Sequence, residues 1–299
     1  MYTYPTLEWE VSDVYRIFAD SSCDMPPEVL EKWGVSTVNL TFHFEGEERE
    51  YANNQMTFGD FYKRLREGAV AKTSAANEAA FKAAFEPVLQ AGEDILYVAF
   101  SSGLSTTCQS GAIAAEELTE QYPDRKIRVV DSLCASGGYG LLVYLAVQRR
   151  EAGETLEQVA QYVLDTRLHL AHWFTVEDLQ FLKRGGRVSA AAALLGGLLG
   201  IKPVMHVDDE GKLTVVTKVR GRRTSLQAMA DKIGEMGLDP TKGPIFITHG
   251  DCMGDVEILK KMIKDKYGLG VDIVSYVGTV IGAHSGPGTM ALFFLAKER

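Results

Sequence analysis

The chain has 299 residues, which is enough for two domains of ordinary size with substantial cores. A formal net charge of −9 without a long Lys/Arg run argues against partners that select basic surfaces, namely nucleic acids and anionic membranes. The four cysteines are scattered, which favours a protein in a reducing compartment. No apolar run reaches the roughly 18 residues that a membrane span needs, and no secretory signal pattern is found. We therefore expect a cytoplasmic protein without a transmembrane segment.

The first half of the chain alternates short β-rich runs with helical patterns, which is typical of a mostly parallel sheet flanked by helices. Strands are expected at 16–19, within 35–44, at 95–100 and at 127–130. Helices are expected from Pro26 or Pro27 to Gly34, from Thr57 to about 66, at about 77–90, from Ser101–Thr107 to about 121, at about 138–150, and from Thr155 to about 169. Residues 70–74 read as a loop.

The second half has a different pattern. It predicts a β-hairpin from residues 204–207 and 213–217, helices at about 225–236 and 254–267, and strands at 245–249, 271–276 and 290–295. A small, apolar, glycine-rich segment covers 189–200. The chain is therefore expected to be an α/β protein, with an N-terminal α/β domain at 1–168 and a C-terminal α+β domain at 169–299.

Hydroxyl-bearing residues follow the predicted strands at Ser21-Ser22, Ser101–Thr107 and Asp131-Ser132. In a parallel α/β sheet, ligands bind outside these carboxyl ends. The middle loop, with Ser102, Gly103 and Ser105, also leads into a helix, whose free backbone N–H groups favour an anion. Simple N-capping explains the same residues about equally well. Thr73 and Ser74 precede another helix, and there a cap or turn is the simpler interpretation.

Two glycine-rich loops of the second half carry further candidates. His284 lies between Gly282 and a Gly-Pro-Gly turn, and Arg187 ends a basic segment that lacks the spacing of a P-loop.

The cluster Arg220, Arg222 and Arg223 reads as a solvated face. His169 and His172 read as structural residues, because no carboxylate or cysteine cluster completes a metal site. No G-x-S-x-G, H-E-x-x-H or G-x-G-x-x-G motif is found, so no metal and no cofactor is expected.

Taken in order, these loops resemble the DegV family of bacterial lipid-binding proteins over nearly the whole chain. The motifs that carry the resemblance are Asp20-Ser-Ser-Cys-Asp24, Lys72-Thr-Ser74, Ser101-Ser-Gly-Leu-Ser105, Val130-Asp-Ser132 with Ala135-Ser-Gly137, Phe181–Arg187, Ile201-Lys-Pro203, Lys218-Val-Arg-Gly221 and His284-Ser-Gly-Pro-Gly288. Each motif is short, but their joint order and spacing are highly specific.

The resemblance implies a long-chain fatty acid whose acyl chain lies in the first domain and whose carboxylate lies near the domain interface. Thr73 and Ser105 fall on the family's lipid-contacting positions. His284 falls near the carboxylate, and Arg187 near the mouth of the site. Two departures put the ligand's identity in question: Ala76 and Asn77 interrupt a Thr-Ser-Gln-Pro-Ser motif, and Thr106 replaces a glycine, so that a shifted backbone is expected.

The leading hypothesis is a carrier without enzymatic activity of its own. In this hypothesis the protein holds the fatty acid by its carboxylate and presents it to the ATP-binding subunit of a fatty acid kinase. An autonomous hydrolase or acyltransferase that uses Ser105 and His284 is the alternative, and a module that binds another anionic small molecule is a third.

Overall fold

The computed structural model describes residues 14–53, 55–188, 200–238 and 243–299, so most of the apolar segment predicted at 189–200 lies outside the described residues. The strands are β1 (Tyr15–Asp20), β2 (Val35–Val38), β3 (Thr41–Phe44), β4 (Glu50–Ala52), β5 (Ala71–Ser74), β6 (Asp94–Ala99), β7 (Ile127–Asp131), β8 (Leu170–Thr175), β9 (Ile201–Val207), β10 (Leu213–Arg220), β11 (Phe246–His249), β12 (Ile273–Tyr276) and β13 (Met290–Leu295). The helices are α1 (Pro27–Lys32), α2 (Phe58–Arg66), α3 (Glu78–Gln90), α4 (Thr107–Gln121), α5 (Ser136–Glu151), α6 (Leu156–Thr166), α7 (Leu179–Arg184), α9 (Arg222–Met236), α10 (Met253–Tyr267) and α11 (Thr279–Ser285), with short 3₁₀ turns η1 (Ser21–Cys23) and η2 (Arg167–His169).

The first sheet is wholly parallel, with strand order β2-β1-β6-β7. Its central strand β6 is buried along its whole length, as the continuous apolar run predicted. The connections after β1 and β6 leave in opposite directions along the sheet, so the topological switch point lies between these two strands. The predicted α/β fold class is confirmed.

The second sheet is mixed, with order β10-β9-β8-β13-β11-β12, and only β11 and β12 pair in parallel. The predicted hairpin is present as β9 and β10. Strand β8 follows directly after η2, in a segment for which the sequence predicted no element. Its residues alternate between two cores, since His172 and Phe174 face one side and Ala171 and Trp173 the other.

A third, antiparallel sheet of order β4-β3-β5 was not expected. The β-rich run 35–44 divides into β2 in the first sheet and β3 in the third. The loop predicted at 70–74 is wrong, because Ala71–Ser74 forms strand β5 by pairing with β3, thirty residues earlier in the chain. This sheet packs with α2 and α11 around Phe42, Phe44 and Phe61, so a segment of the first half contacts a helix of the second half.

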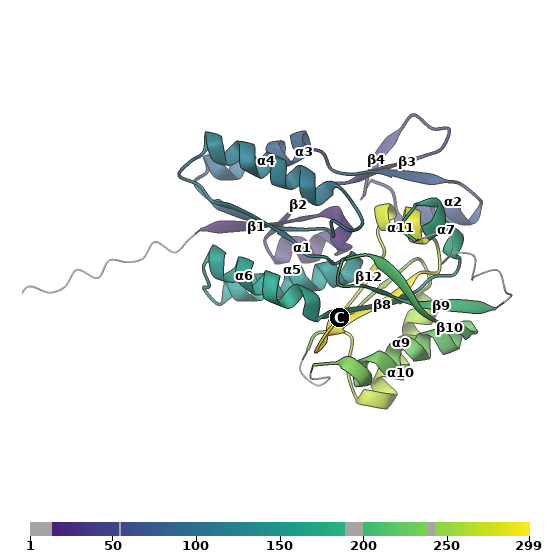
Figure 1. Cartoon of the computed structure of the whole chain (residues 1–299). Coiled ribbons are helices and arrows are strands. Elements are labelled where there is room, and N and C mark those ends of the chain that lie inside the picture. Colours follow the sequence, from purple (N-terminus) through teal and green to yellow (C-terminus); the bar gives the residue numbers. More distant parts are fainter. Residues whose placement is uncertain (1–13, 54, 189–199, 239–242) are drawn as a thin grey trace, which may run out of the picture.

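The two larger sheets stack with helices between and outside them (Figure 1). Helices α3 and α4 cover one face of the first sheet. Helix α5 lies between the two sheets, and α9 and α10 cover the outer face of the second. In the part of the chain that the structure describes, no helix is long and apolar enough to cross a membrane.

Local sequence signals set several helix ends as predicted. Thr57 accepts a hydrogen bond from Asp60 N at the start of α2, and Thr155 forms a capping box with Gln158 at the start of α6. Two of the glycine-rich loops are instead partly helical: α7 covers most of the Phe181–Arg187 segment, and His284 lies in the last turn of α11.

Candidate functional site

A cavity of about 440 Å³ lies where the switch point of the first sheet meets the inner face of the second sheet. Its apolar wall includes Phe100 after β6, Phe174 on β8 and Phe293 on β13. The remaining lining residues are Leu40, Thr73, Ala75, Ser102, Leu104, Ser105, Thr106, Ala135, Ser136, His172, Leu182, Arg187, Val207, Leu213, Val277, Val280, Ile281, His284, Ser285, Thr289 and Ala291. The cavity volume is within the range of roughly 300–1,000 Å³ of small-molecule sites, and both halves of the chain supply its wall.

Thr73 and His284, which are 211 residues apart, contact each other at this cavity. The distance from Thr73 Oγ1 to His284 Nε2 is 2.8 Å. Strand β5 sets the direction of Thr73, because successive side chains of a strand point to opposite faces. Thr73 therefore lines the cavity, whereas its neighbour Ser74 is exposed and does not line it.

The imidazole of His284 is neutral. Burial, and secondarily the Arg187 guanidinium, lower the pKa of His284 to about 4. Its Nδ1 is buried with no hydrogen-bond partner in the part of the chain that the structure describes, and it lies against Gly185, where a Cβ atom would approach within 2.1 Å. An anion that accepts from the Thr73 hydroxyl requires the imidazole proton on Nε2, because Thr73 Oγ1 must then accept from the ring. Nε2–H then donates to Thr73 Oγ1, which leaves the Thr73 hydroxyl free to donate to a ligand.

The loop after β6 brings a second set of polar groups to the cavity. Ser105 Oγ accepts from Thr107 N at 3.2 Å and lies 2.9 Å from Thr107 Oγ1, so it caps the start of α4. Ser102 also lines the cavity, whereas Gly103 lines an adjacent open groove. Thr106 has φ −78° and ψ −1°, so it fits this loop without the strain of a positive φ.

Arg187 connects the two halves at the junction of the cavity and the groove, since it lines both. Its Nε donates to Leu104 O at 3.1 Å, and its Nη1 donates to Gly185 O. Burial lowers the pKa of Arg187, but an arginine whose ordinary pKa is above 12 keeps its charge. The site therefore has one positive charge beside neutral hydroxyl donors, which is a suitable environment for an anion.

Two buried polar atoms on α11 have no partner among the described residues, namely His284 Nδ1 and Ser285 Oγ. Buried polar side chains are usually hydrogen-bonded, and an unpaired group costs about 1–3 kcal/mol. Both residues line the cavity. The unpaired hydroxyl of Ser285 leaves a hydrogen-bond donor at the polar end of the cavity, whereas His284 Nδ1 lies against Gly185 and, as an acceptor, cannot pair with an anion.

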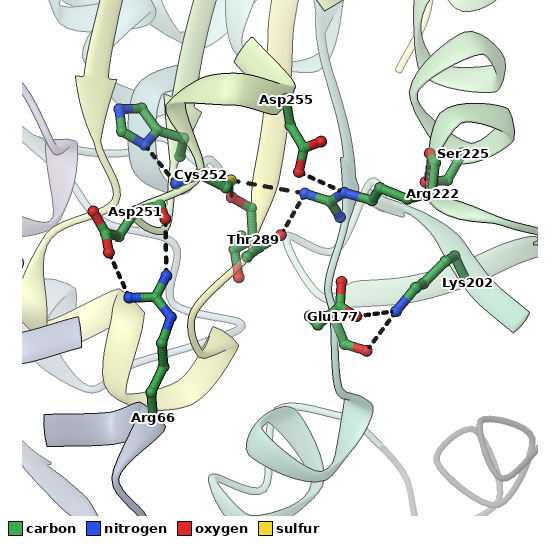
Figure 2. Close-up of polar contacts among 11 residues, drawn as sticks. Arg66, Glu177, Lys202, Arg222, Ser225, Asp251, Cys252, Asp255 and Thr289 are labelled. Atoms are coloured by element: carbon green, nitrogen blue, oxygen red, sulfur yellow. Dashed lines mark hydrogen bonds and ion pairs between the residues drawn. The ribbon is translucent and has the colours of Figure 1, made fainter. Parts of the chain in front are cut away.

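The turn after His284 is fixed by Arg222, which the sequence analysis wrongly read as part of a solvated face. Arg222 Nη2 donates to Gly288 O at 2.6 Å, and its Nε donates to Asp255 Oδ2 at 3.0 Å (Figure 2). The Sγ of Cys252 donates to the carbonyl of Thr289 on the same turn. Arg222 therefore supports the backbone that follows the site.

The two aspartates of Asp20-Ser-Ser-Cys-Asp24, for which the motif alone predicts no role, are both buried beside the switch point. Ser136 donates to Asp24 Oδ2, and Ser275 donates to Asp24 O, so Asp24 joins α5 of the first half to β12 of the second. Burial raises the pKa of Asp24 to about 8. Two aspartates at fixed spacing after a buried strand were the available signal, but Tyr97 and Phe100, which contact Asp20, and Ser136 and Ser275, which contact Asp24, lie far away in the sequence.

The geometry does not support the hydrolase alternative. A serine nucleophile needs its base within hydrogen-bonding distance. The contacts that the structure describes join Ser105 to Thr107 and His284 to Thr73. In the described ranges, no cluster of three or more His, Cys, Asp or Glu side chains is arranged to hold a metal ion.

The fold and the cavity define an α/β protein with a ligand-sized, largely apolar cavity that has a polar end between a parallel and a mixed sheet. The DegV family model, which describes uncharacterised proteins, matches residues 15–297, and the chain belongs to the DegV family.

Similar proteins agree with this assignment. A DegV domain-containing protein of Clostridium perfringens is 41% identical over 288 residues, which cover 95% of this chain and 98% of the relative. The solved DegV family protein of Thermus thermophilus, described as fatty acid binding, is 28% identical with a TM-score of 0.83, over 95% and 99% of the two chains. A stearic acid-binding protein of Eubacterium ventriosum is 26% identical with a TM-score of 0.86, also over 95% and 99%. Fatty acid binding is thus a property of members of this family.

Proposed function

We propose that this protein binds a long-chain fatty acid, with the carboxylate at Thr73, Ser105 and His284 and the acyl chain along the apolar wall of the cavity. The observation that carries the proposal is the cavity itself, because it combines an aromatic and aliphatic wall with a polar end where buried atoms lack partners. The similar solved proteins of Thermus thermophilus and Eubacterium ventriosum bind fatty acids, which supports the same ligand class here.

The energetics of such a ligand are favourable. A 16-carbon chain buries roughly 15 methylene groups, on the order of 12 kcal/mol before the costs of binding. A buried carboxylate must be hydrogen-bonded or paired. The Thr73 and Ser105 hydroxyls and the Arg187 guanidinium supply those interactions. The carboxylate then lies where the expected domains 1–168 and 169–299 meet. The acyl chain of the ligand lies between the two halves of the protein rather than within the first half alone.

The first test is the lipid content of the purified protein. Protein made in bacteria is expected to contain close to one fatty acid per chain, measured by denaturing extraction and mass spectrometry. Repeated recovery of lipid-free protein that also fails to take up added fatty acid contradicts the proposal.

We further propose that the protein presents the bound carboxylate to the ATP-binding subunit of a fatty acid kinase, as the DegV resemblance implies. Arg187 lies at the mouth of the cavity, and a guanidinium binds phosphate oxygens in a bidentate manner. Phosphoryl transfer depends mainly on positioning and electrostatics. Loss of the Arg187 or His284 side chain is therefore expected to reduce transfer by a larger factor than it weakens fatty acid binding, because the acyl chain supplies most of the binding free energy.

The test measures acyl-phosphate formation with a fatty acid kinase ATP-binding subunit, together with lipid content, for Arg187→Ala and His284→Ala. Reduced transfer with retained lipid supports the proposal. Full-rate transfer in both variants contradicts it, and loss of lipid in both variants assigns the two residues to binding alone.

A further inference from the structure

Helix α11 carries a large share of the cavity wall, because Val280, Ile281, His284 and Ser285 all line the cavity. The helix has only seven residues. Short helices depend on their tertiary contacts, because little of their stability comes from within. Its own N-cap residue is Gly278, which has no side chain to accept from the free N–H groups of the first turn.

Asn53, at the end of β4 in the first half, supplies the missing cap. Asn53 Oδ1 accepts from Val280 N at 3.1 Å and lies 2.9 Å from the hydroxyl of Thr279. The same hydroxyl is 3.1 Å from Asn53 O. Asparagine is among the preferred cap residues, but here it acts across 227 positions of the chain instead of from the preceding residue.

Asn53 is itself fixed in place. It is only 8% exposed, and its Nδ2 donates to Ser21 O at 3.0 Å in the loop that follows β1. Tyr62 of α2 donates to Val277 O at 2.7 Å, directly before the helix. The start of α11 is therefore attached to three segments of the first half: the β1 loop, the end of β4 and helix α2.

The position of His284 follows from this attachment. His284 lies five residues after Thr279, about 7.5 Å along the helix axis. In the last turn of the helix, His284 Nε2 contacts Thr73 Oγ1 at 2.8 Å, and His284 Nδ1 lies against Gly185. A small rotation of the helix start would displace the imidazole from this narrow space.

We propose that Asn53 is a positioning residue of the fatty acid site, which caps α11 from the opposite half of the chain and so sets His284 beside Thr73. The inference rests on the proposed function, and it adds a residue that does not line the cavity.

The test compares Asn53→Ala and Asn53→Asp for binding of an 18-carbon fatty acid and the 18-carbon alcohol, which shares the chain but lacks the carboxylate. Asn53→Ala is expected to weaken acid binding about tenfold and leave alcohol binding within about twofold, because the effect is confined to the polar end. Asn53→Asp keeps the accepting oxygen but replaces the Nδ2 donor to Ser21 O by a second acceptor, so its acid binding is expected to fall, though by less than that of Asn53→Ala. If Asn53→Ala does not fold, Asn53→Ser replaces it, with an intermediate expected loss.

Asn77→Ala is the matched control. Asn77 caps α3 by accepting from Ala80 N at 2.9 Å, and no residue of α3 lines the cavity. Its loss is expected to lower stability without changing the preference for acid over alcohol. In a His284→Ala background, Asn53→Ala is expected to weaken acid binding by less than about twofold, since coupled residues are not additive.

The outcomes separate the two proposals. A wild-type protein that binds neither ligand contradicts the proposed function. A wild-type protein that prefers the acid, together with an Asn53→Ala variant that keeps this preference or loses both ligands equally, overturns only the role of Asn53. An undiminished effect of Asn53→Ala in the His284→Ala background also overturns it.

Discussion

Two buried polar clusters lie near the switch point of the first sheet, and they differ in how completely they are paired. Around Asp20, the carboxylate accepts from Ser22 N, Phe100 N and the hydroxyl of Tyr97. At the polar end of the cavity, His284 Nδ1 and Ser285 Oγ remain without partners among the described residues. Asp20 is fully buried, whereas the half-buried His284 and the buried Ser285 line the cavity, where a ligand can reach them.

The difference in pairing distinguishes a cluster that stabilises the fold from a cluster that can bind a ligand. A buried network in which every group is paired stabilises one arrangement of the chain. A buried cluster with unpaired groups lowers stability unless a ligand completes it. Asp24 is an intermediate case, because its Oδ2 accepts from Ser136 while its Oδ1 is buried with no hydrogen-bond partner in the described ranges. Substitutions in the Asp20 network, at the polar end of the cavity and at Asp24 are therefore expected to have different effects.

The largest effect is expected for Asp20→Ala. The change leaves the Tyr97 hydroxyl and the amides of Ser22 and Phe100 buried without their acceptor, so the free energy of unfolding should fall by more than about 3 kcal/mol. Urea unfolding measures it, with Asp165→Ala at an exposed position as the control. A loss no larger than that of the control would show that the network is dispensable.

Thr73→Ala and Ser105→Ala are expected to affect the ligand rather than the fold. Each removes one hydrogen bond to a charged carboxylate, worth about 1.5–3 kcal/mol, or roughly ten- to hundredfold in fatty acid affinity. The midpoint of unfolding of the lipid-free protein should change little. Unchanged affinity in both variants would place the carboxylate elsewhere.

Asp24 is expected to make stability depend on pH. Burial raises its pKa from 3.8 to about 8, so the folded state keeps a proton that the unfolded state releases. The stabilisation is complete below the unfolded pKa and is lost as the pH rises towards 8, by at most about 1.4 kcal/mol per pH unit. Asp24→Asn should flatten this part of the profile in urea titrations between pH 5 and pH 8. A wild-type profile equal to that of the variant would contradict it.

The smallest effect is expected for Gly185→Ala. A Cβ atom there would lie 2.1 Å from His284 Nδ1, so the imidazole must move, and fatty acid affinity should fall about threefold through a weakened contact with Thr73. Gly254→Ala is the matched control, since nothing lies within 4 Å of its added Cβ. Equal affinity of the two variants would show that the imidazole can shift without consequence.

Periodicity and cap residues predicted most of the fold, because they act within a few residues. Strand β6, the hairpin of β9 and β10 and the caps Thr57 and Thr155 are of this kind. Strand β5 and helix α11 were not predicted, because both depend on contacts with residues far away in the sequence. The sequence Ala-Lys-Thr-Ser has no strand pattern of its own, and β5 exists through its pairing with β3. Helix α11 has a glycine, Gly278, at its N-cap position and receives its cap from Asn53.

The candidate site shows the same limit. Motif order placed Thr73, Ser102, Ser105, Arg187 and His284 on one cavity, but it could not show that Ser74 points away from it. That outcome depends on strand alternation in β5, which the sequence analysis read as a loop.

The place of β13 in the second sheet has a consequence for the order in which the chain folds during synthesis. All strands of the first sheet lie before residue 132, so this sheet can form while the rest of the chain is still being translated. Strand β13 is central in the second sheet, between β8 and β11, yet it follows every other strand in the chain. Until Leu295 has left the ribosome, β8 and β11 have no common neighbour, and the wall that Ala291 and Phe293 give to the cavity is absent. The strands of the first sheet can therefore pair before β13 is made, whereas the core between the two sheets, which includes Phe293, and the wall of the cavity are completed only with β13.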